Sequence, residues 1–226
     1  MVGIPHILAG YNTCMRINTI FFDLDETLYP ASSGLWAVIG ERINTYLHER
    51  MGIPADETQA LHERFFREYG TTLRGLQVNF KVNTDDYLAF VHDVPLDHYL
   101  RPDPELRKII SALPARKFIF TNSDRAHAGR VLEVLGLQGI FDGILDVHTL
   151  APYCKPMRES FEMALQAAGS PDWQDCALLD DQARITQAAR SLGMYTVLVG
   201  KPLTDGKADA ALDKWADLPA LLEARI

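Results

Sequence analysis

The sequence predicts an α/β fold, a doubly wound parallel sheet with a helical cap inserted after its first strand. Helices and strands alternate from about residue 103 to about residue 200, which is typical of parallel β-α-β units with right-handed crossovers. One more strand pattern lies near the N-terminus, and only helical patterns separate it from the alternating region. We therefore divide the chain into an α/β core at 15–30 and 101–226 and a helical cap domain at 31–100.

The first strand is the apolar run INTIFFDLD at 17–25, which is short and rich in β-branched and aromatic residues. Helical periodicity follows it. The residues expected on the buried stripes of the first two cap helices are Leu35, Ile39, Ile43 and Leu47, and then Leu61, Phe65 and Tyr69. Glycines break the pattern at 69–76, where we expect a loop, and a third cap helix is predicted at about 84–92.

The alternating region supplies the rest of the sheet. The predicted strands are 117–122, 143–147, 176–181 and 195–200. The predicted helices are about 103–112, 126–136, 156–168 and 183–193.

Amino-acid composition limits the kinds of molecule that the protein is expected to bind. The 226 residues are 47% hydrophobic and 23% charged, with a net charge of −8, so we expect neither a nucleic acid polymer nor an anionic membrane as a partner. Three cysteines, at 14, 154 and 176, favour reduced thiols and a cytoplasmic location. No run approaches the length of a membrane helix, and residues 1–14 lack the pattern of a secretion signal. The oligomeric state is left open.

Polar side chains follow the predicted strands at the point where each strand ends. They are Asp23 and Asp25, Thr121 and Asn122, Lys155, and Asp180 and Asp181. Because ligands bind outside the carboxyl ends of the strands in a doubly wound sheet, we expect these side chains to form one site. Clustered carboxylates repel one another unless a cation lies among them, and oxygen ligands favour a hard ion such as Mg²⁺ beside a substrate phosphate.

The two acids of the first strand suggest a division of labour. Asp23 and Asp25 leave an extended chain on the same side, so both can reach one substrate. One carboxylate can attack phosphorus, and the other can protonate the leaving oxygen and then deprotonate water. The pattern therefore predicts a phosphatase acting on small phosphorylated metabolites.

Four motifs, FFDLDETLYP, FTNSD, CKP and LLDD, occur in this order and resemble those of the haloacid dehalogenase (HAD) superfamily of phosphatases. The resemblance implies a Rossmann-like core and an aspartyl-phosphate intermediate. By that resemblance Asp23 is the nucleophile, Asp25 the general acid and base, and Lys155 a bridge between nucleophile and phosphate. Thr121 and Asn122 bind phosphoryl oxygens. The implied Mg²⁺ ligands are the carboxylates of Asp23, Asp180 and Asp181 and the backbone carbonyl of Asp25.

A narrower resemblance joins the chain to the pyrimidine 5′-nucleotidase subgroup. It rests on DETLYPASSGLW, YGTTLRGL and FTNSDRAHAGRVLEVLGL with FDGI, and it implies nucleoside 5′-monophosphates as substrates. Gln182 and Ile185 depart from the serine and asparagine usual after the last acid pair, so the hydrogen bonds of that loop are expected to differ.

Arg74 lies in the glycine-flanked segment of the cap, and we predict that it contacts the substrate. We expect His127 to open a helix without a chemical task. Other functions stay open: a phosphatase of sugar or other metabolite phosphates, a dehalogenase, a phosphomutase, or a catalytically silent binding module. The second aspartate and the full acid set argue against the dehalogenase.

Overall fold

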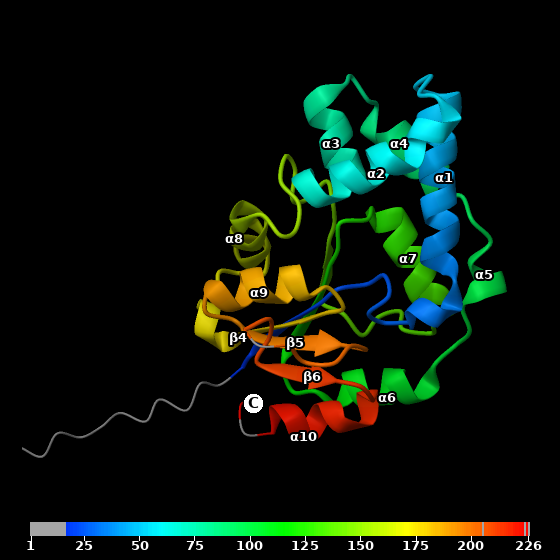
Figure 1. Cartoon of the computed structure of the whole chain (residues 1–226). Coiled ribbons are helices and arrows are strands. Elements are labelled where there is room, and N and C mark those ends of the chain that lie inside the picture. The colour runs from blue at the N-terminus through cyan, green and yellow to red at the C-terminus, as the bar shows by residue number, and fades with distance from the viewer. Residues whose placement is uncertain (1–16, 205, 224, 226) are drawn as a thin grey trace, which may run out of the picture.

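The computed structural model describes residues 17–204, 206–223 and 225. Its sheet has six parallel strands in the order β3-β2-β1-β4-β5-β6, so the prediction of a doubly wound parallel sheet is confirmed (Figure 1). The strands are β1 Thr19–Phe22, β2 Arg116–Phe120, β3 Gly143–Leu145, β4 Cys176–Asp180, β5 Tyr195–Val199 and β6 Ala210–Leu212. The expectations about residues 1–14, with Cys14, lie outside the described residues.

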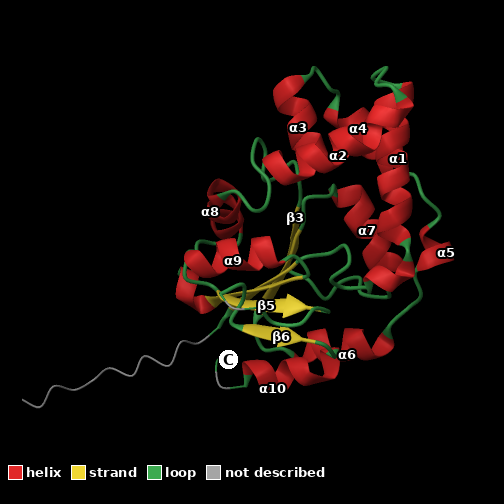
Figure 2. Ribbon diagram, viewed as in Figure 1, coloured by secondary structure: helices red, strands yellow, loops and turns green. Residues whose placement is uncertain are grey.

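Helices account for most of the rest (Figure 2). Those between β1 and β2 are α1 Leu35–Glu49, α2 Ala55–Tyr69, α3 Thr72–Asn79, α4 Thr84–Val91, α5 Leu96–Tyr99 and α6 Pro104–Ala112. The later ones are α7 Arg125–Val134, α8 Arg158–Ala167, α9 Ala183–Ser191 and α10 Leu218–Leu222. Three 3-10 turns lie at Ala31–Ser33, Trp173–Asp175 and Trp215–Asp217. No helix in this described part is long and apolar enough to cross a membrane.

The alternation of side chains along β1 separates two apolar layers. Ile20 and Phe22 pack on the face that joins the core of the cap, with residues of α1, α6, α7 and α10. Phe21 packs on the opposite face, with residues of α8 and α9. All three side chains are fully buried, as expected for a parallel strand covered on both faces.

The helical insertion gathers α1 to α4 beyond one edge of the core, over the ends of the strands (Figure 1). Its predicted stripe from Leu35 to Leu47 is buried, as is Phe65. Of the segment expected to be a loop at 69–76, residues 72–76 instead form the start of α3, and only 70 and 71 connect it to α2. The Thr71 side chain accepts a hydrogen bond from the Arg74 amide, so it caps that helix and explains why the chain becomes helical there.

Strand register brings the predicted site residues to one edge of the sheet. Phe22 of β1 lies beside Ile119 of β2 and Leu179 of β4. The residues that follow these positions, Asp23 and the polar groups after β2 and β4, therefore leave the sheet side by side. The register is the reason why motifs far apart in sequence form one site.

Close packing of α2 on α3 gives a test of the cap. A Cβ added at Gly75 would overlap the Phe65 ring, so Gly75→Ala is expected to lower the free energy of unfolding by about 1–3 kcal/mol. Gly129 in α7 has open space at the same position, so Gly129→Ala is expected to raise it by about 0.4–1 kcal/mol. Denaturant unfolding of both variants measures this difference. Equal effects would contradict the helix contact described here.

Candidate active site

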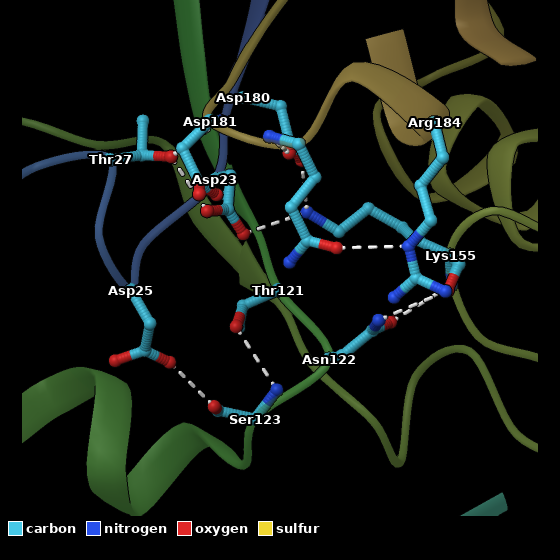
Figure 3. A network of polar contacts seen from close by, with 11 residues as sticks. Asp23, Asp25, Thr27, Thr121, Asn122, Ser123, Lys155, Asp180, Asp181 and Arg184 are labelled. Carbon is cyan, nitrogen blue, oxygen red and sulfur yellow. Dashed lines mark hydrogen bonds and ion pairs between the residues drawn. The ribbon is translucent and has the colours of Figure 1, made fainter. Parts of the chain in front are cut away.

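The centre of the site is the buried amine of Lys155. Its Nζ donates to Asp23 Oδ1 at 2.7 Å and to Asp180 Oδ2 at 2.8 Å (Figure 3). Only 1% of this side chain is exposed, and its pKa is raised because two carboxylates outweigh the opposing effect of burial. The lysine therefore stays charged and ties the first strand to the fourth.

Three buried carboxylates surround this amine. Asp23, Asp180 and Asp181 each offer an oxygen, and the three oxygens lie within 4.8 Å of one another. Burial, together with the neighbouring Asp180 and Asp181, raises the pKa of Asp23, although Lys155 opposes this rise. Three acids and one buried amine leave an excess of negative charge, which suits a hard divalent cation with oxygen ligands.

The hydrogen bonds of Asp181 are compatible with a cation in this group. Its Oδ1 is buried and has no hydrogen-bond partner in the described structure. Its Oδ2 accepts a hydrogen bond of 2.8 Å from Lys201, which is about half exposed. A buried carboxylate oxygen without a partner is costly, and a metal ion would satisfy it.

Thr27 connects the nucleophile candidate to the acid pair. Its hydroxyl donates to Asp23 Oδ2 at 2.7 Å and accepts a hydrogen bond of 3.1 Å from the Asp181 amide. Both oxygens of Asp23 are thus held, one by Thr27 and one by Lys155. This leaves the carboxylate fixed in orientation before any substrate arrives.

Asp25 has a different environment. Its carboxylate accepts from the Tyr29 hydroxyl at 2.7 Å, the Ser123 hydroxyl at 2.7 Å and the His127 ring at 2.8 Å. It is turned toward Ser123 and stands apart from the acid cluster (Figure 3). Although burial alone would raise it, His127, Ser123 and Tyr29 hold the pKa of Asp25 well below its usual range. The two aspartates of the first motif therefore differ in protonation behaviour.

The residues after β2 also lie in the site. Thr121 is buried, and its hydroxyl accepts a hydrogen bond from the Ser123 amide. Asn122 exchanges two hydrogen bonds with the backbone of Lys155, at 2.8 Å and 3.1 Å. Asn122 therefore holds the loop that carries the lysine, and its predicted contact with phosphate stays a prediction.

A cavity of about 80 Å³ lies between these groups and the cap. Its charged lining residues, Asp23, Asp25, Glu26 and Lys155, all come from the core. The cap contributes apolar and aromatic side chains and uncharged polar ones: Trp36, Ile39, Ile43, His62, Phe66, Thr71, Thr72, Leu73, Tyr87, Leu88, Val91 and His92. Small-molecule sites usually measure roughly 300–1,000 Å³, so this cavity is smaller than that range.

Arg74 does not line this cavity, although Thr71, Thr72 and Leu73 do. It lies in the first turn of α3, half-buried, and its Nε is buried without a partner in the described structure. Its charge offsets part of the rise that burial causes in the pKa of Cys154. Contact between Arg74 and substrate stays a prediction.

The expectation that His127 has no chemical task is not supported by its position. It lies in the first turn of α7, as expected, but its ring contacts Asp25. Ser123, Tyr29 and Thr27 were also missed. Ser123 lies within the second motif, FTNSD, and Thr27 and Tyr29 lie within the first, FFDLDETLYP, which are the signals that could have suggested them.

The structure shows what surrounds Gln182 and Ile185, the two residues that depart from the pattern of the subgroup. Gln182 accepts a hydrogen bond from Arg184, and Ile185 is a buried residue in the first turn of α9. The Arg184 guanidinium also donates to the carbonyls of Phe66 and Gly70, at the C-terminal end of α2. The first turn of α9 thus binds the cap directly.

Comparison with known proteins agrees with this geometry. The family model of the haloacid dehalogenase-like hydrolases matches residues 17–193. Phosphate metabolism protein 8 of Saccharomyces cerevisiae is 32% identical over 194 residues, which cover 79% of this chain and 60% of that protein. The match thus spans well under two thirds of that relative.

Solved structures share the fold. An HAD phosphatase from Thermococcus onnurineus has a TM-score of 0.60 and 17% identity, covering 92% of this chain and 99% of that one. A β-phosphoglucomutase from Clostridium difficile has a TM-score of 0.59 and 19% identity, covering 92% and 96%. The HAD-hydrolase YfnB from Bacillus subtilis, bound to magnesium, has a TM-score of 0.57 and 16% identity, covering 92% and 99%.

The chain combines a doubly wound sheet with acidic strand ends that face a helical insertion. The chain belongs to the haloacid dehalogenase-like hydrolase family. It is an enzyme of the hydrolase class.

Lys155 gives a stability test of the site. Lys155→Met leaves the buried Asp23 and Asp180 carboxylates without their cation, and breaking a buried ion pair in this way costs about 3–5 kcal/mol. The exposed Lys108 is a matched control, and Lys108→Met is expected to change stability by less than about 0.5 kcal/mol. Denaturant unfolding in the presence of a chelator measures both. An unchanged free energy of unfolding in Lys155→Met would contradict the bridging role.

Proposed function

We propose that the protein is a Mg²⁺-dependent phosphatase of small phosphate monoesters, working through an aspartyl-phosphate on Asp23. One observation carries the proposal: two carboxylates two residues apart occupy separate environments. Asp23 belongs to the acid cluster around Lys155, and Asp25 is held by neutral and imidazole donors. Pairs of acids whose environments differ in this way usually divide nucleophilic and proton-transfer roles.

In the first step an oxygen of Asp23 attacks phosphorus. A bond forms between that oxygen and phosphorus while the bond from phosphorus to the leaving oxygen breaks. Asp25 gives its proton to the leaving oxygen, because the negative charge of a bound phosphate favours the protonated form of a nearby carboxyl group. Lys155 and the hydroxyl of Thr121, which both line the cavity, would hold the charge of the transferring group.

In the second step water attacks the phosphoryl group on Asp23, and Asp25 takes the proton of that water. The three hydrogen bonds to Asp25 favour its charged form, which is the form that acts as a base. Asp23 leaves as a carboxylate and inorganic phosphate departs. The site returns to its starting state.

Asp23, Asp180 and Asp181, with the backbone carbonyl of Asp25, would hold the metal ion. The unpartnered oxygen of Asp181 supports this assignment, as does the similarity in fold to a protein crystallised with magnesium. When bound, the ion would supply positive charge to the phosphoryl group.

For the substrate we infer a monoester with an uncharged leaving group, most simply a nucleoside 5′-monophosphate. The cap lines the cavity with Trp36, Phe66 and Tyr87 and offers no charged side chain. Aromatic rings suit the flat face of a base, whereas a second anionic group would be desolvated there without a partner. Sugar and other metabolite phosphates are the second candidate. We also propose a cytoplasmic location, which the free thiols of Cys154 and Cys176 support.

The division of roles predicts two different losses. Asp23→Asn should abolish phosphate release, because the amide has nearly the same shape but cannot attack phosphorus. Asp25→Asn should slow turnover by about 10²–10⁴-fold, the usual contribution of general acid–base assistance. Phosphate release is measured for each variant beside its thermal midpoint, to confirm folding. Near-normal turnover in Asp23→Asn would exclude the covalent route.

Metal removal tests the acid cluster in two ways. A chelator should abolish activity and Mg²⁺ should restore it, whereas Ca²⁺ should inhibit because its coordination is larger and looser. Mg²⁺ should also raise the thermal midpoint, with about 2.7 kcal/mol of stabilisation at a hundredfold excess over the dissociation constant. Asp181→Asn should lose this rise and the exposed control Asp213→Asn should keep it. Full activity in chelator would overturn the metal assignment.

Arg74 tests substrate choice. Its unpartnered Nε could bind a base or sugar oxygen when the cap closes, so Arg74→Ala should cost about 1–3 kcal/mol in kcat/KM for a pyrimidine nucleoside monophosphate. Hydrolysis of p-nitrophenyl phosphate, which offers no base, should change far less. If both substrates lose the same factor, Arg74 serves the fold or the phosphate and does not read the base.

A further inference from the structure

Two donors meet on one oxygen of the proposed acid–base residue. Asp25 Oδ1 accepts from the Tyr29 hydroxyl at 2.7 Å and from His127 Nε2 at 2.8 Å. The other oxygen, Oδ2, accepts from Ser123. The position of the Asp25 carboxylate is therefore set by three side chains from two segments, Tyr29 after β1 and Ser123 and His127 after β2.

Both the backbone and the side chain of His127 are held in place. Its side chain is fully buried, and its amide donates to Asp124 Oδ1 at 2.8 Å in the first turn of α7. The remaining ring nitrogen, Nδ1, has no hydrogen-bond partner among the described residues. The ring therefore has a single polar contact there, the one with Asp25.

A second histidine holds the ring of the first. His92 stacks on His127 with ring centroids 4.1 Å apart and planes within 18°. His92 Nδ1 bonds to Asp124 Oδ2 at 2.6 Å, and Arg130 donates to the His92 carbonyl. One carboxylate, Asp124, thus anchors both histidines, through a different oxygen for each.

Tyr29 and His92 lie on the two segments that connect the core to the cap. Tyr29 lies on the outgoing segment between β1 and α1, and His92 directly follows α4 on the returning segment. Tyr29 contacts Asp25 directly, and His92 contacts it through His127. The outgoing segment therefore contacts Asp25 Oδ1 directly through Tyr29. The returning segment contacts the His127 ring, which bonds to the same oxygen.

We propose that His127 is a positioning residue for Asp25 and that His92, on the returning segment of the cap, holds His127 in that role. The inference rests on the proposed function, because it assigns these histidines to the proton transfer of that reaction. The competing explanation is that the two rings serve packing alone. The two explanations differ in which substrates lose rate.

Leaving-group dependence separates the two explanations. A phenol that is already a good leaving group needs little help from Asp25, whereas a poorer one depends on its proton. The measured quantity is kcat/KM for a series of aryl phosphates, from p-nitrophenyl through phenyl to p-methoxyphenyl phosphate. It reports the steps up to the first irreversible one, which includes the departure of the phenol.

His127 supplies a matched pair of variants. The amide nitrogen of glutamine reaches about as far as Nε2 and can still donate to Asp25, whereas that of asparagine reaches only the place of Nδ1. In His127→Asn, we expect the loss in kcat/KM to be at least about tenfold larger for phenyl than for p-nitrophenyl phosphate, a fraction of the full contribution of acid catalysis. His127→Gln should recover most of this difference.

His92 supplies a second pair that avoids changing the buried His127. His92→Phe keeps a flat ring against His127 and loses the bond to Asp124, and His92→Asn keeps a donor for Asp124 and loses the ring. We expect His92→Asn to show the steeper leaving-group dependence. If His127→Asn fails to fold, as judged by its thermal midpoint, this pair alone decides.

An equal loss across the aryl series, in the His127 pair and the His92 pair, would overturn the inference and leave the proposed phosphatase intact. If the parent enzyme releases no phosphate from any of these esters, the proposed function has failed, and the inference fails with it. A steeper series in His127→Asn and in His92→Asn, with recovery in His127→Gln, supports the positioning role.

Discussion

The site depends on one buried amine. Lys155 Nζ lies between Asp23 and Asp180, and removal of this charge would leave carboxylates from β1 and β4 facing each other in the interior. The loop that places it is held by the reciprocal bonds between Asn122 and the lysine backbone. The interactions of Lys155 therefore join the ends of β1, β2 and β4. They also supply the positive charge that offsets the repulsion within the acid cluster.

Much of this arrangement could be predicted from the sequence because strand ends in a parallel sheet meet at one edge. Asp23, Lys155 and Asp180 were placed in that way. The contact between His127 and Asp25 could not be found so, because His127 lies inside α7 and its ring reaches Asp25 only through the packing of that helix. Such contacts depend on how helices pack and leave no local pattern. The first turn of α3 was also not predicted. Gly70 and Gly75 suggested a loop there, whereas Thr71 caps a helix.

Cap and core are joined around the reaction centre. Arg184 binds the carbonyls at the end of α2, and the Cys154 thiol, one residue before Lys155, bonds to the Tyr69 carbonyl. The cap brings an uncharged surface to a core that holds all the charged groups of the cavity. On the proposed function, the core would carry the chemistry and the cap would select the leaving group.

The central claim is that Asp23 carries the phosphoryl group, and trapping that group tests it most directly. The Asp25→Asn variant, in which the water attack is slowed, is mixed with p-nitrophenyl phosphate and Mg²⁺, quenched in acid and digested for mass spectrometry. The account predicts a phosphoryl group on the peptide that contains Asp23, and its absence in the double variant that also carries Asp23→Asn. Release of p-nitrophenol without any phosphorylated peptide, or with the group on another residue, would contradict it.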